Sequence, residues 1–392
     1  MAIVFIPGIK GSELIDSYPL DWPRRWSLED MVIGDLVENP HDFSLTEGRY
    51  DAADGHWMRP GRLIHYAYGA MIAKLRQWKQ PEPVYTFSYD WRKPLELSAQ
   101  RLVRAMDVLS GREQAAGRTP ELKFITHSMG GLLLRSALGL RNRRNPFDGI
   151  GRTVCIAPPF RGSIGAPYAL VVGEKDGWFG TDEDYRSIAR TFPSVYQMTP
   201  SWHAAAIDSE GRPLDLFNAA NWQANVRDGG QFRARFLADA EAFVRGRAGQ
   251  FGGVSDAPML SDAILARHAD KVLVLCGAGI ETHRQLPVET DNTRNPNWFD
   301  FAGARSDPNG DGRVHFLSAA IRGVTLAAFR NAGQHALLCR DERVTNLTSL
   351  WLEGHKALKM TRRTAQHSVA RPSRSYFESW DGKADSFAQH VV

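Results

Sequence analysis

The sequence is poor in cysteine and in net charge. Its 392 residues include only three cysteines, Cys155, Cys276 and Cys339, and the first two lie inside apolar runs. An odd number of cysteines in such positions indicates reduced, buried thiols rather than a disulfide framework. The formal net charge is only +4, and the Lys and Arg residues are scattered without interleaved aromatic residues. This pattern lacks the electrostatic footprint of nucleic-acid binding, so we expect no nucleic-acid partner.

The N-terminus also lacks a long hydrophobic run. The opening MAIVFIPG has no basic residue before its apolar stretch and reaches a Pro-Gly turn at Pro7 and Gly8. That stretch is too short for a signal peptide or a membrane span. From the chain as written we expect a cytoplasmic protein.

What the sequence does contain is a regular alternation of apolar strands and helical patterns. With 43% apolar and 23% charged residues, it has the composition of a globular enzyme. Because parallel strands need crossover connections, this alternation predicts an α/β fold with a mainly parallel, doubly wound sheet. The expected strands lie within 2–7, 83–92, 122–125, 151–163 and 271–279, and the expected helices within 97–109, 132–138, 232–244 and 344–355.

Two segments depart from this alternation. Between about 163 and 270 the pattern is irregular, and we interpret it as a lid or cap inserted over the carboxyl edge of the sheet, where ligands bind in such folds. The tail is basic and Ser-rich over 359–374. We therefore expect one domain over 1–358 and a basic C-terminal extension over 359–392. A solvated arm is the favoured interpretation of that tail over a tether to lipid or to a polyanion.

The stretch FITHSMGG places Ser128 between a strand and a helix. Such a sharp turn forces its corner residue into a strained conformation, and Gly130 keeps the neighbouring backbone free of clashes. This is the pattern of a nucleophile elbow, which exposes a serine oxygen at a helix N-terminus. The first glycine of G-x-S-x-G is replaced by Thr126. The structural alternative is a Ser-Gly turn that only joins the two elements.

A serine nucleophile needs a base and an acid, and this fold orders them Ser, acid, His. Asp311, in SDPNGDGRV, and His335, in NAGQHALL, follow Ser128 in that order. His315 is a rival base, but it begins an apolar stretch, whereas His335 follows a glycine on an expected loop. His127 adjoins the serine and is expected to point away from it, so we assign it to packing around the site.

The oxyanion of an acyl-transfer intermediate needs backbone donors. In this fold they come from the residue after the nucleophile and from a loop after an early strand, which names the N–H groups of Met129 and Ile9. The sequence CGAGIET, at 276–282, begins like a dinucleotide fingerprint but lacks the third glycine, so we set it aside. We expect no cofactor.

DPNGDG also matches the first half of a calcium loop, with oxygen ligands at Asp307, Asn309 and Asp311. The twelfth position of that loop requires a carboxylate, and here it is Ser318. We therefore expect no metal and keep Asp311 as the acid.

Taken together, the motifs resemble those of the lecithin:cholesterol acyltransferase-like α/β-hydrolases, a group that includes a lysosomal phospholipase A2. The resemblance runs from about residue 3 to about residue 355 and rests on motifs in the family's order, namely VFIPGIKGSEL, YDWR, HSMGG, APPFRGS, RTFPSVYQMTP, GDGRV and GQHALL.

The resemblance implies an α/β-hydrolase fold, a triad of Ser128, Asp311 and His335, and an oxyanion hole at Ile9 and Met129. It further implies a mobile lid near VVGEKDGWFGTDEDY, at 171–185, over an acyl-ester site. Asp90 and Arg92 match the family's YDWR, where a structural pairing and a substrate role both stay open. Trp178 and Phe179 of the lid, with Trp22 and Trp26, are candidates for contact with a lipid interface.

These observations favour a serine-dependent acyl-ester hydrolase or acyltransferase, lipase- or phospholipase-like, that works through an acyl-enzyme. The expected partner is an acyl-ester or lipid substrate, with a transient membrane or lipid interface. Two alternatives stay open: a small-molecule ester or amide hydrolase that never meets lipid, and a catalytically silent binding module with the hydrolase fold, for which Thr126 is the only hint.

Overall fold

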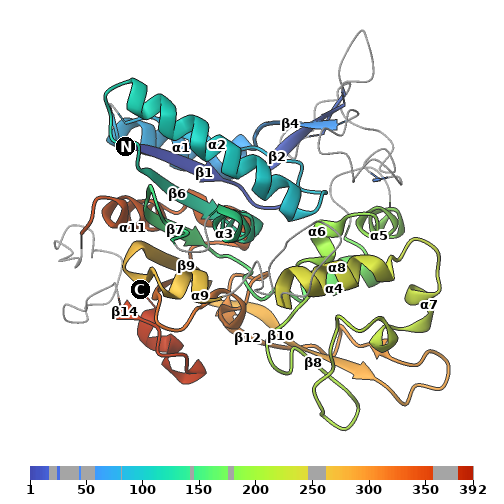
Figure 1. Ribbon diagram of the computed structural model, residues 1–392. Coiled ribbons are helices and arrows are strands. Elements are labelled where there is room, and N and C mark those ends of the chain that lie inside the picture. The colour runs from blue at the N-terminus through green and yellow to red at the C-terminus, as the bar shows by residue number, and fades with distance from the viewer. Residues whose placement is uncertain are drawn as a thin grey trace.

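The computed structural model describes residues 1–16, 24–26, 44–45, 58–80, 82–141, 145–174, 181–245, 262–355 and 378–391. Within these residues the central sheet has seven strands in the order β14-β13-β9-β7-β6-β1-β5 (Figure 1). Neighbouring strands from β13 to β5 pair in parallel, and β14 is antiparallel to β13. The predicted parallel α/β sheet is thus confirmed. Its strands are β1 (Ala2–Ile6), β5 (Val84–Thr86), β6 (Leu122–His127), β7 (Ile150–Ile156), β9 (Val272–Ala278), β13 (Thr325–Arg330) and β14 (Glu378–Ser379).

Both faces of this sheet are covered, which explains why β1 and β9 are apolar throughout. In β1 every residue is buried. Val4 and Ile6 pack with residues of the helices on one face, and Ile3 and Phe5 with residues of the helices on the other. The first face carries α2 (Leu95–Ala115) and α3 (Met129–Arg141), and the second carries α1 (His65–Trp78) and α11 (Glu342–Leu352).

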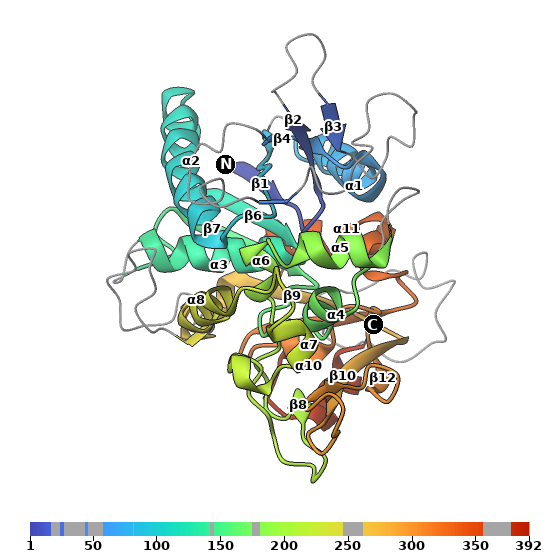
Figure 2. The ribbon, with the colours of Figure 1, turned by 90° about the vertical axis from the view of Figure 1, so that its right-hand side faces the viewer.

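The segment between β7 and β9 leaves the sheet. Most of its helices gather beyond the carboxyl ends of the strands, where α4, α6 and α8 lie together, whereas α9 lies beside α3 (Figures 1 and 2). The bounds of an inserted cap over 163–270 and its action as a lid both stay predictions. The helices are α4 (Gly165–Val171), α5 (Asp182–Ala189), α6 (Pro193–Tyr196), α7 (Ala224–Arg227), α8 (Ala234–Arg245) and α9 (Asp262–Ala266).

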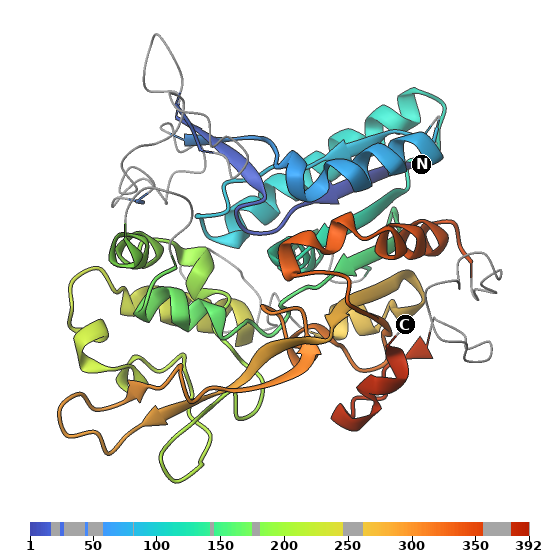
Figure 3. The ribbon, with the colours of Figure 1, turned by 180° about the vertical axis from the view of Figure 1, so that it is seen from behind.

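A second insertion, which the sequence analysis did not anticipate, separates β9 from β13. It is an antiparallel arm built from β10 (Ile280–Glu289) and β12 (Arg305–Gly310) and extended by β11 (Trp298–Phe299). In the 163–270 segment, β8 (Ala206–Ile207) pairs with β10 in parallel. Figure 3 shows the arm reaching from the sheet to the 163–270 segment. It therefore ties the two insertions together.

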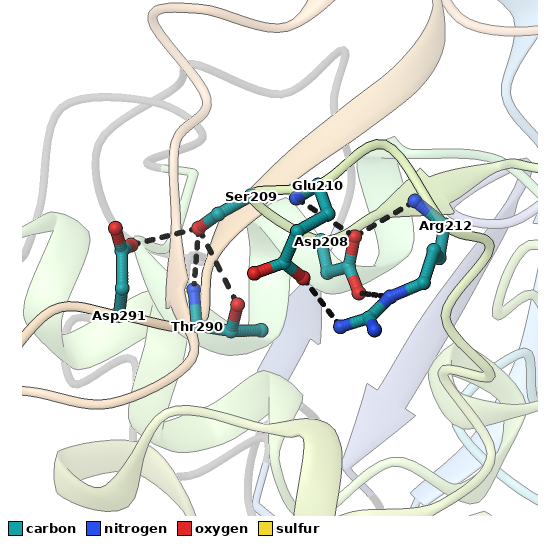
Figure 4. A network of polar contacts seen from close by, with 6 residues as sticks. All are labelled: Asp208, Ser209, Glu210, Arg212, Thr290 and Asp291. Atoms are coloured by element: carbon teal, nitrogen blue, oxygen red, sulfur yellow. Dashed lines mark hydrogen bonds and ion pairs between the residues drawn. The ribbon is translucent and has the colours of Figure 1, made fainter.

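Polar contacts fasten the arm where β8 meets β10 (Figure 4). The Ser209 hydroxyl donates to Asp291 at 2.7 Å and accepts from the Thr290 N–H at 3.1 Å. Asp208 accepts from the Arg212 guanidinium at 2.6 Å and so closes the turn that follows β8. These bonds hold the turn against the far end of β10.

The end of the chain corrects our expectation of a C-terminal extension over 359–392. Residues 378–391 return to the sheet, because β14 pairs with β13 and the 3₁₀ helix η5 (Ala384–His390) follows it. Trp380 and Phe387 are buried, and the Phe387 ring stacks on Phe316 with centroids 4.2 Å apart. Burial of these two aromatic residues draws the segment into the core. The basic stretch 359–374 lies outside the described residues.

A small antiparallel sheet lies beside this core, formed by β2 (Ser12–Asp16), β3 (Arg24–Trp26) and β4 (Met58–Leu63). Its three strands lie between β1 and α1 along the chain. Among the described residues, no helix combines the length and the apolar composition that a membrane crossing requires.

Candidate active site

Ser128 occupies the turn between β6 and α3 in a strained backbone conformation. Its φ is +52°, and its N–H donates to the Ile156 carbonyl at 2.8 Å. The backbone around it is too crowded for side chains, because a Cβ built on Gly130 would lie 2.5 Å from the Pro7 carbonyl oxygen and one on Gly131 2.8 Å from Pro158 Cβ. A non-glycine residue with positive φ is costly and persists where the surroundings enforce it. This is the geometry of a nucleophile elbow.

Thr126, which replaces the first glycine of the usual pattern, fits this turn without disturbing it. It is fully buried in β6 and pairs in register with Cys155 of β7. Its Oγ1 lies 3.4 Å from the position that a Cβ on Gly131 would occupy. The absence of a side chain at Gly131 therefore leaves room beside the Thr126 side chain.

Asp311 and His335 meet at the same edge of the sheet. His335 Nδ1 lies 2.7 Å from Asp311 Oδ2, and the His335 N–H donates to the Asp311 carbonyl at 3.0 Å. The other carboxylate oxygen, Oδ1, accepts from the N–H groups of Arg313 at 3.0 Å and Val314 at 2.8 Å. Asp311 is thus fixed through side chain and main chain.

This environment keeps Asp311 ionised. Burial by itself would raise the pKa of the carboxyl, but the proximity of His335 and the hydrogen bonds from His335, Val314 and Arg313 outweigh it and lower the pKa. The close approach also needs Gly277, because a Cβ there would lie 2.5 Å from Asp311 Cβ. An ionised carboxylate in this place holds the Nδ1–H tautomer of His335 and leaves Nε2 as the acceptor.

Ser128 and His335 line one cavity of about 300 Å³ above the elbow. Ile9, a candidate oxyanion donor, lies on the same wall. Most of the remaining lining is apolar. It is contributed by Trp91, Ala166, Ala169, Ile188, Phe192, Val195 and Met198, with Lys10, Glu174 and Arg313 as its charged members.

The charged members of the lining lie together. The Arg313 guanidinium makes two hydrogen bonds to the Glu174 carboxylate, one of them at 2.6 Å. Burial lowers the pKa of Lys10 to about 8, although the nearby Glu174 carboxylate acts in the opposite direction. The cavity thus has a long apolar wall and one polar corner.

The loop that carries Ile9 is held from several sides. The Tyr89 hydroxyl donates to the Pro7 carbonyl at 3.0 Å, and the Gly11 N–H donates to the Gly8 carbonyl at 3.1 Å. A Cβ on Gly8 would lie 2.8 Å from Ser128 Cβ, so only glycine permits this approach. The loop thereby packs directly against Ser128.

The two other candidate histidines have different partners. His315 Nε2 lies 2.9 Å from Asp307, and its Nδ1 accepts from the Leu317 N–H, so it caps a short helix rather than joining Asp311. His127 is buried, with Tyr68 Oη 3.0 Å from Nδ1 and the His335 carbonyl oxygen 3.0 Å from Nε2. The Asp307 and Asp311 carboxylates, considered above as calcium ligands, thus face separate histidines.

Asp90 and Arg92 form a buried pair with each other, with hydrogen bonds of 2.9 and 2.7 Å. This arrangement favours the structural interpretation of YDWR over a substrate role. The residue between them, Trp91, lines the cavity and was not predicted as a site residue. Its position within a recognised motif was the one signal that could have identified it. Trp178 and Phe179, predicted for the lid, lie outside the described residues.

Comparison with known proteins finds a family to which part of the chain is similar. The family model for lecithin:cholesterol acyltransferase matches residues 54–226. Lecithin-cholesterol acyltransferase-like 4 of Arabidopsis thaliana is 25% identical over 151 residues, which cover 35% of this chain and 27% of that relative. The chain thus matches about a quarter of the length of that relative.

One solved structure shows the same fold, and a second is a weaker match. A chain in the crystal structure of the Tle4-Tli4 complex covers 91% of this chain and 97% of its own length, at 14% identity and a TM-score of 0.56. The mature lipase BlEst2 of Bacillus licheniformis covers 90% of this chain and 91% of its own, at 12% identity and a TM-score of 0.38. The fold assignment rests on the first of these likenesses and on the sheet described above. The chain has an α/β-hydrolase fold, and its residues 54–226 are similar to the lecithin:cholesterol acyltransferase family.

Proposed function

We propose that the protein is a serine-dependent acyl-ester hydrolase or acyltransferase that acts on lipid esters through an acyl-enzyme. The observation that carries the proposal is the pairing of His335 with the buried carboxylate of Asp311, 2.7 Å apart, in the wall of the cavity that also exposes the strained Ser128. The family match supports an acyl-ester substrate, and the apolar lining supports a lipid one.

In this mechanism Ser128 Oγ attacks the ester carbonyl, and its proton passes to His335 Nε2. Asp311 accepts the Nδ1–H bond and stabilises the imidazolium as it forms. His335 then returns the proton to the leaving alcohol, which gives the acyl-enzyme. Water or an acceptor alcohol reverses the sequence and frees Ser128.

The negative charge that develops on the carbonyl oxygen is assigned to the N–H groups of Met129 and Ile9. Met129 is the first residue of α3, where the helix dipole favours an anion. Ile9 lies in the glycine loop that approaches Ser128. Removal of one such donor typically raises the barrier by about 3 kcal/mol.

The lining of the cavity indicates where the acyl part and the alcohol part of an ester substrate would bind. An acyl chain suits the surface formed by Trp91, Ile188 and Phe192, because burial of apolar area stabilises it. The polar corner at Glu174 and Arg313 suits the alcohol part of the ester. This division is the reason to prefer a lipid ester over a small polar one.

A serine-reactive fluorophosphonate tests the proposal directly. The wild-type protein should be labelled, Ser128→Ala should not, and Ser163→Ala is the matched control. Ser163 lines the same cavity, but its hydroxyl donates to the Arg313 carbonyl at 2.6 Å. Hydrolysis of p-nitrophenyl esters should rise with acyl length, and an added long-chain alcohol would reveal transfer. Persistent labelling of Ser128→Ala would contradict the assignment of the nucleophile.

A further inference from the structure

The imidazole of His127, the residue immediately before Ser128, connects two segments that are far from it in sequence. Its side chain is buried, with only 3% of the residue exposed. Nδ1 lies 3.0 Å from the hydroxyl of Tyr68 on α1, and Nε2 lies 3.0 Å from the main-chain carbonyl oxygen of His335. The His127 and His335 rings lie with centroids 4.9 Å apart.

The chemistry of these groups fixes the direction of every hydrogen bond. A carbonyl oxygen only accepts, so Nε2 of His127 must carry the hydrogen and donate to His335. Nδ1 of the neutral ring is then an acceptor and receives the Tyr68 O–H. The Tyr68 oxygen in turn accepts from the Gly8 N–H at 3.2 Å. Each donor in this chain has one acceptor, and each acceptor has one donor.

Burial keeps the ring in this neutral state. Burial first, and then the nearby His335, lower the pKa of His127 to about 3, although Asp311 acts in the opposite direction. His127 is therefore a fixed donor and acceptor at any pH at which an esterase would work.

This series of hydrogen bonds ends at the Gly8–Ile9 loop on one side and at the main chain of His335 on the other. Gly8 precedes Ile9, and the loop bends around the Tyr68 hydroxyl so closely that a Cβ on Gly11 would lie 2.8 Å from it. At the other end is the main chain of His335, which follows the turn at Gly333, where φ is +89°. The residue before the nucleophile thus contacts the base and, through Tyr68, the oxyanion loop.

We propose that His127 and Tyr68 are positioning residues that hold the main chain of His335 and the Gly8–Ile9 loop in register with Ser128. The inference rests on the proposed function, because it assigns a role to contacts around the same site. This role requires no contact between either side chain and the substrate. Their effect comes through the groups they hold, and a displacement of about 1 Å at a reacting group can cost about 100-fold in rate.

Tyr68→Phe is the first test, since it removes only the hydroxyl. It leaves His127 Nδ1 without its donor and Gly8 without its acceptor. We expect kcat for a soluble p-nitrophenyl ester to fall about 10- to 100-fold, with KM changed less than about threefold, because the cavity wall is intact. His127→Gln retains an N–H that can reach the His335 carbonyl, and His127→Leu does not. Glutamine should therefore retain more kcat than leucine.

Tyr196→Phe is the matched control. The Tyr196 hydroxyl is also buried between two main-chain groups, donating to the Arg190 carbonyl at 3.0 Å and accepting from the Arg233 N–H at 3.1 Å. Loss of that hydroxyl should lower the melting temperature and leave kcat near the wild-type value at a temperature where both proteins are folded.

The outcomes separate the two proposals. If the wild-type protein is neither labelled by a fluorophosphonate nor active on any ester, the proposed function fails. If it is active and Tyr68→Phe reacts at the wild-type rate, or if Tyr68→Phe and Tyr196→Phe lose kcat equally, the positioning role is refuted. Equal kcat in His127→Gln and His127→Leu would also refute it.

Discussion

His127 should make the folded state sensitive to mild acid. Its pKa in the folded protein is lowered to about 3, first by burial and then by the proximity of His335. In the unfolded chain its pKa returns to the ordinary value of about 6.5. Between these values the unfolded chain binds a proton that the folded protein does not, so the free energy of unfolding decreases as the pH falls.

The size of the effect follows from the two pKa values. At pH 5 an unfolded histidine is almost fully protonated, and its proton uptake favours unfolding by about 2 kcal/mol relative to a ring that stays neutral. At pH 7 the same contribution is only about 0.2 kcal/mol. The shift from pH 7 to pH 5 should therefore cost about 2 kcal/mol through this residue alone. The stability is fully present above the unfolded pKa and is lost as the pH falls toward the folded one.

The matched variant is His127→Gln, which cannot titrate. Guanidinium unfolding followed by tryptophan fluorescence at pH 7 and pH 5 gives four free energies. The decrease between the two pH values should be smaller in the variant than in the wild type by about 2 kcal/mol. His203→Gln, which changes an exposed histidine, is the control and should keep the wild-type decrease. Equal decreases in wild type and His127→Gln would show that His127 does not stay neutral in the folded protein.

Three further substitutions test the site and the fold. Gly8→Ala places a Cβ 2.8 Å from Ser128 Cβ, so ester turnover should fall about 10-fold or more, while the circular-dichroism spectrum stays that of the folded protein. Wild-type turnover would mean that the loop can move away from Ser128 without loss of activity. Asp311→Asn should lower kcat about 10⁴-fold because it favours the wrong His335 tautomer, and a loss below tenfold in an esterase assay would exclude Asp311 as the triad acid. Asp262→Asn removes the carboxylate 2.8 Å from buried Arg135 and should lower the free energy of unfolding by about 1–3 kcal/mol in guanidinium, whereas an unchanged midpoint would mean that the pair adds nothing.

The sheet and the elbow could be predicted because their signals are local. β1 and β9 are continuous apolar runs, which is what strands covered on both faces require, and β6 is mostly apolar over 122–125. The glycines that follow Ser128 indicate the turn at this residue. The order of the acid and the histidine then identified Asp311 and His335, which the fold brings within hydrogen-bond distance.

The parts that were missed depend on contacts between distant segments. β13 was not predicted, because Thr325–Arg330 is short and contains two alanines, and its place is set by parallel pairing with β9. Helix α1 was missed with it, and so was Tyr68, whose hydroxyl matters only because Gly8 and His127 lie beside it. No sequence pattern predicts such a contact between distant segments.

Three separate parts of the chain build the site, and each is joined to the next through the main chain. Asp311 and His335 are linked twice, through their side chains and through the bond from the His335 N–H to the Asp311 carbonyl, so they form one unit. That unit is joined to the elbow through the hydrogen bond between His127 and the His335 carbonyl. A perturbation at His127 should therefore move Asp311 and His335 together, preserve their contact with each other, and change only their distance from Ser128.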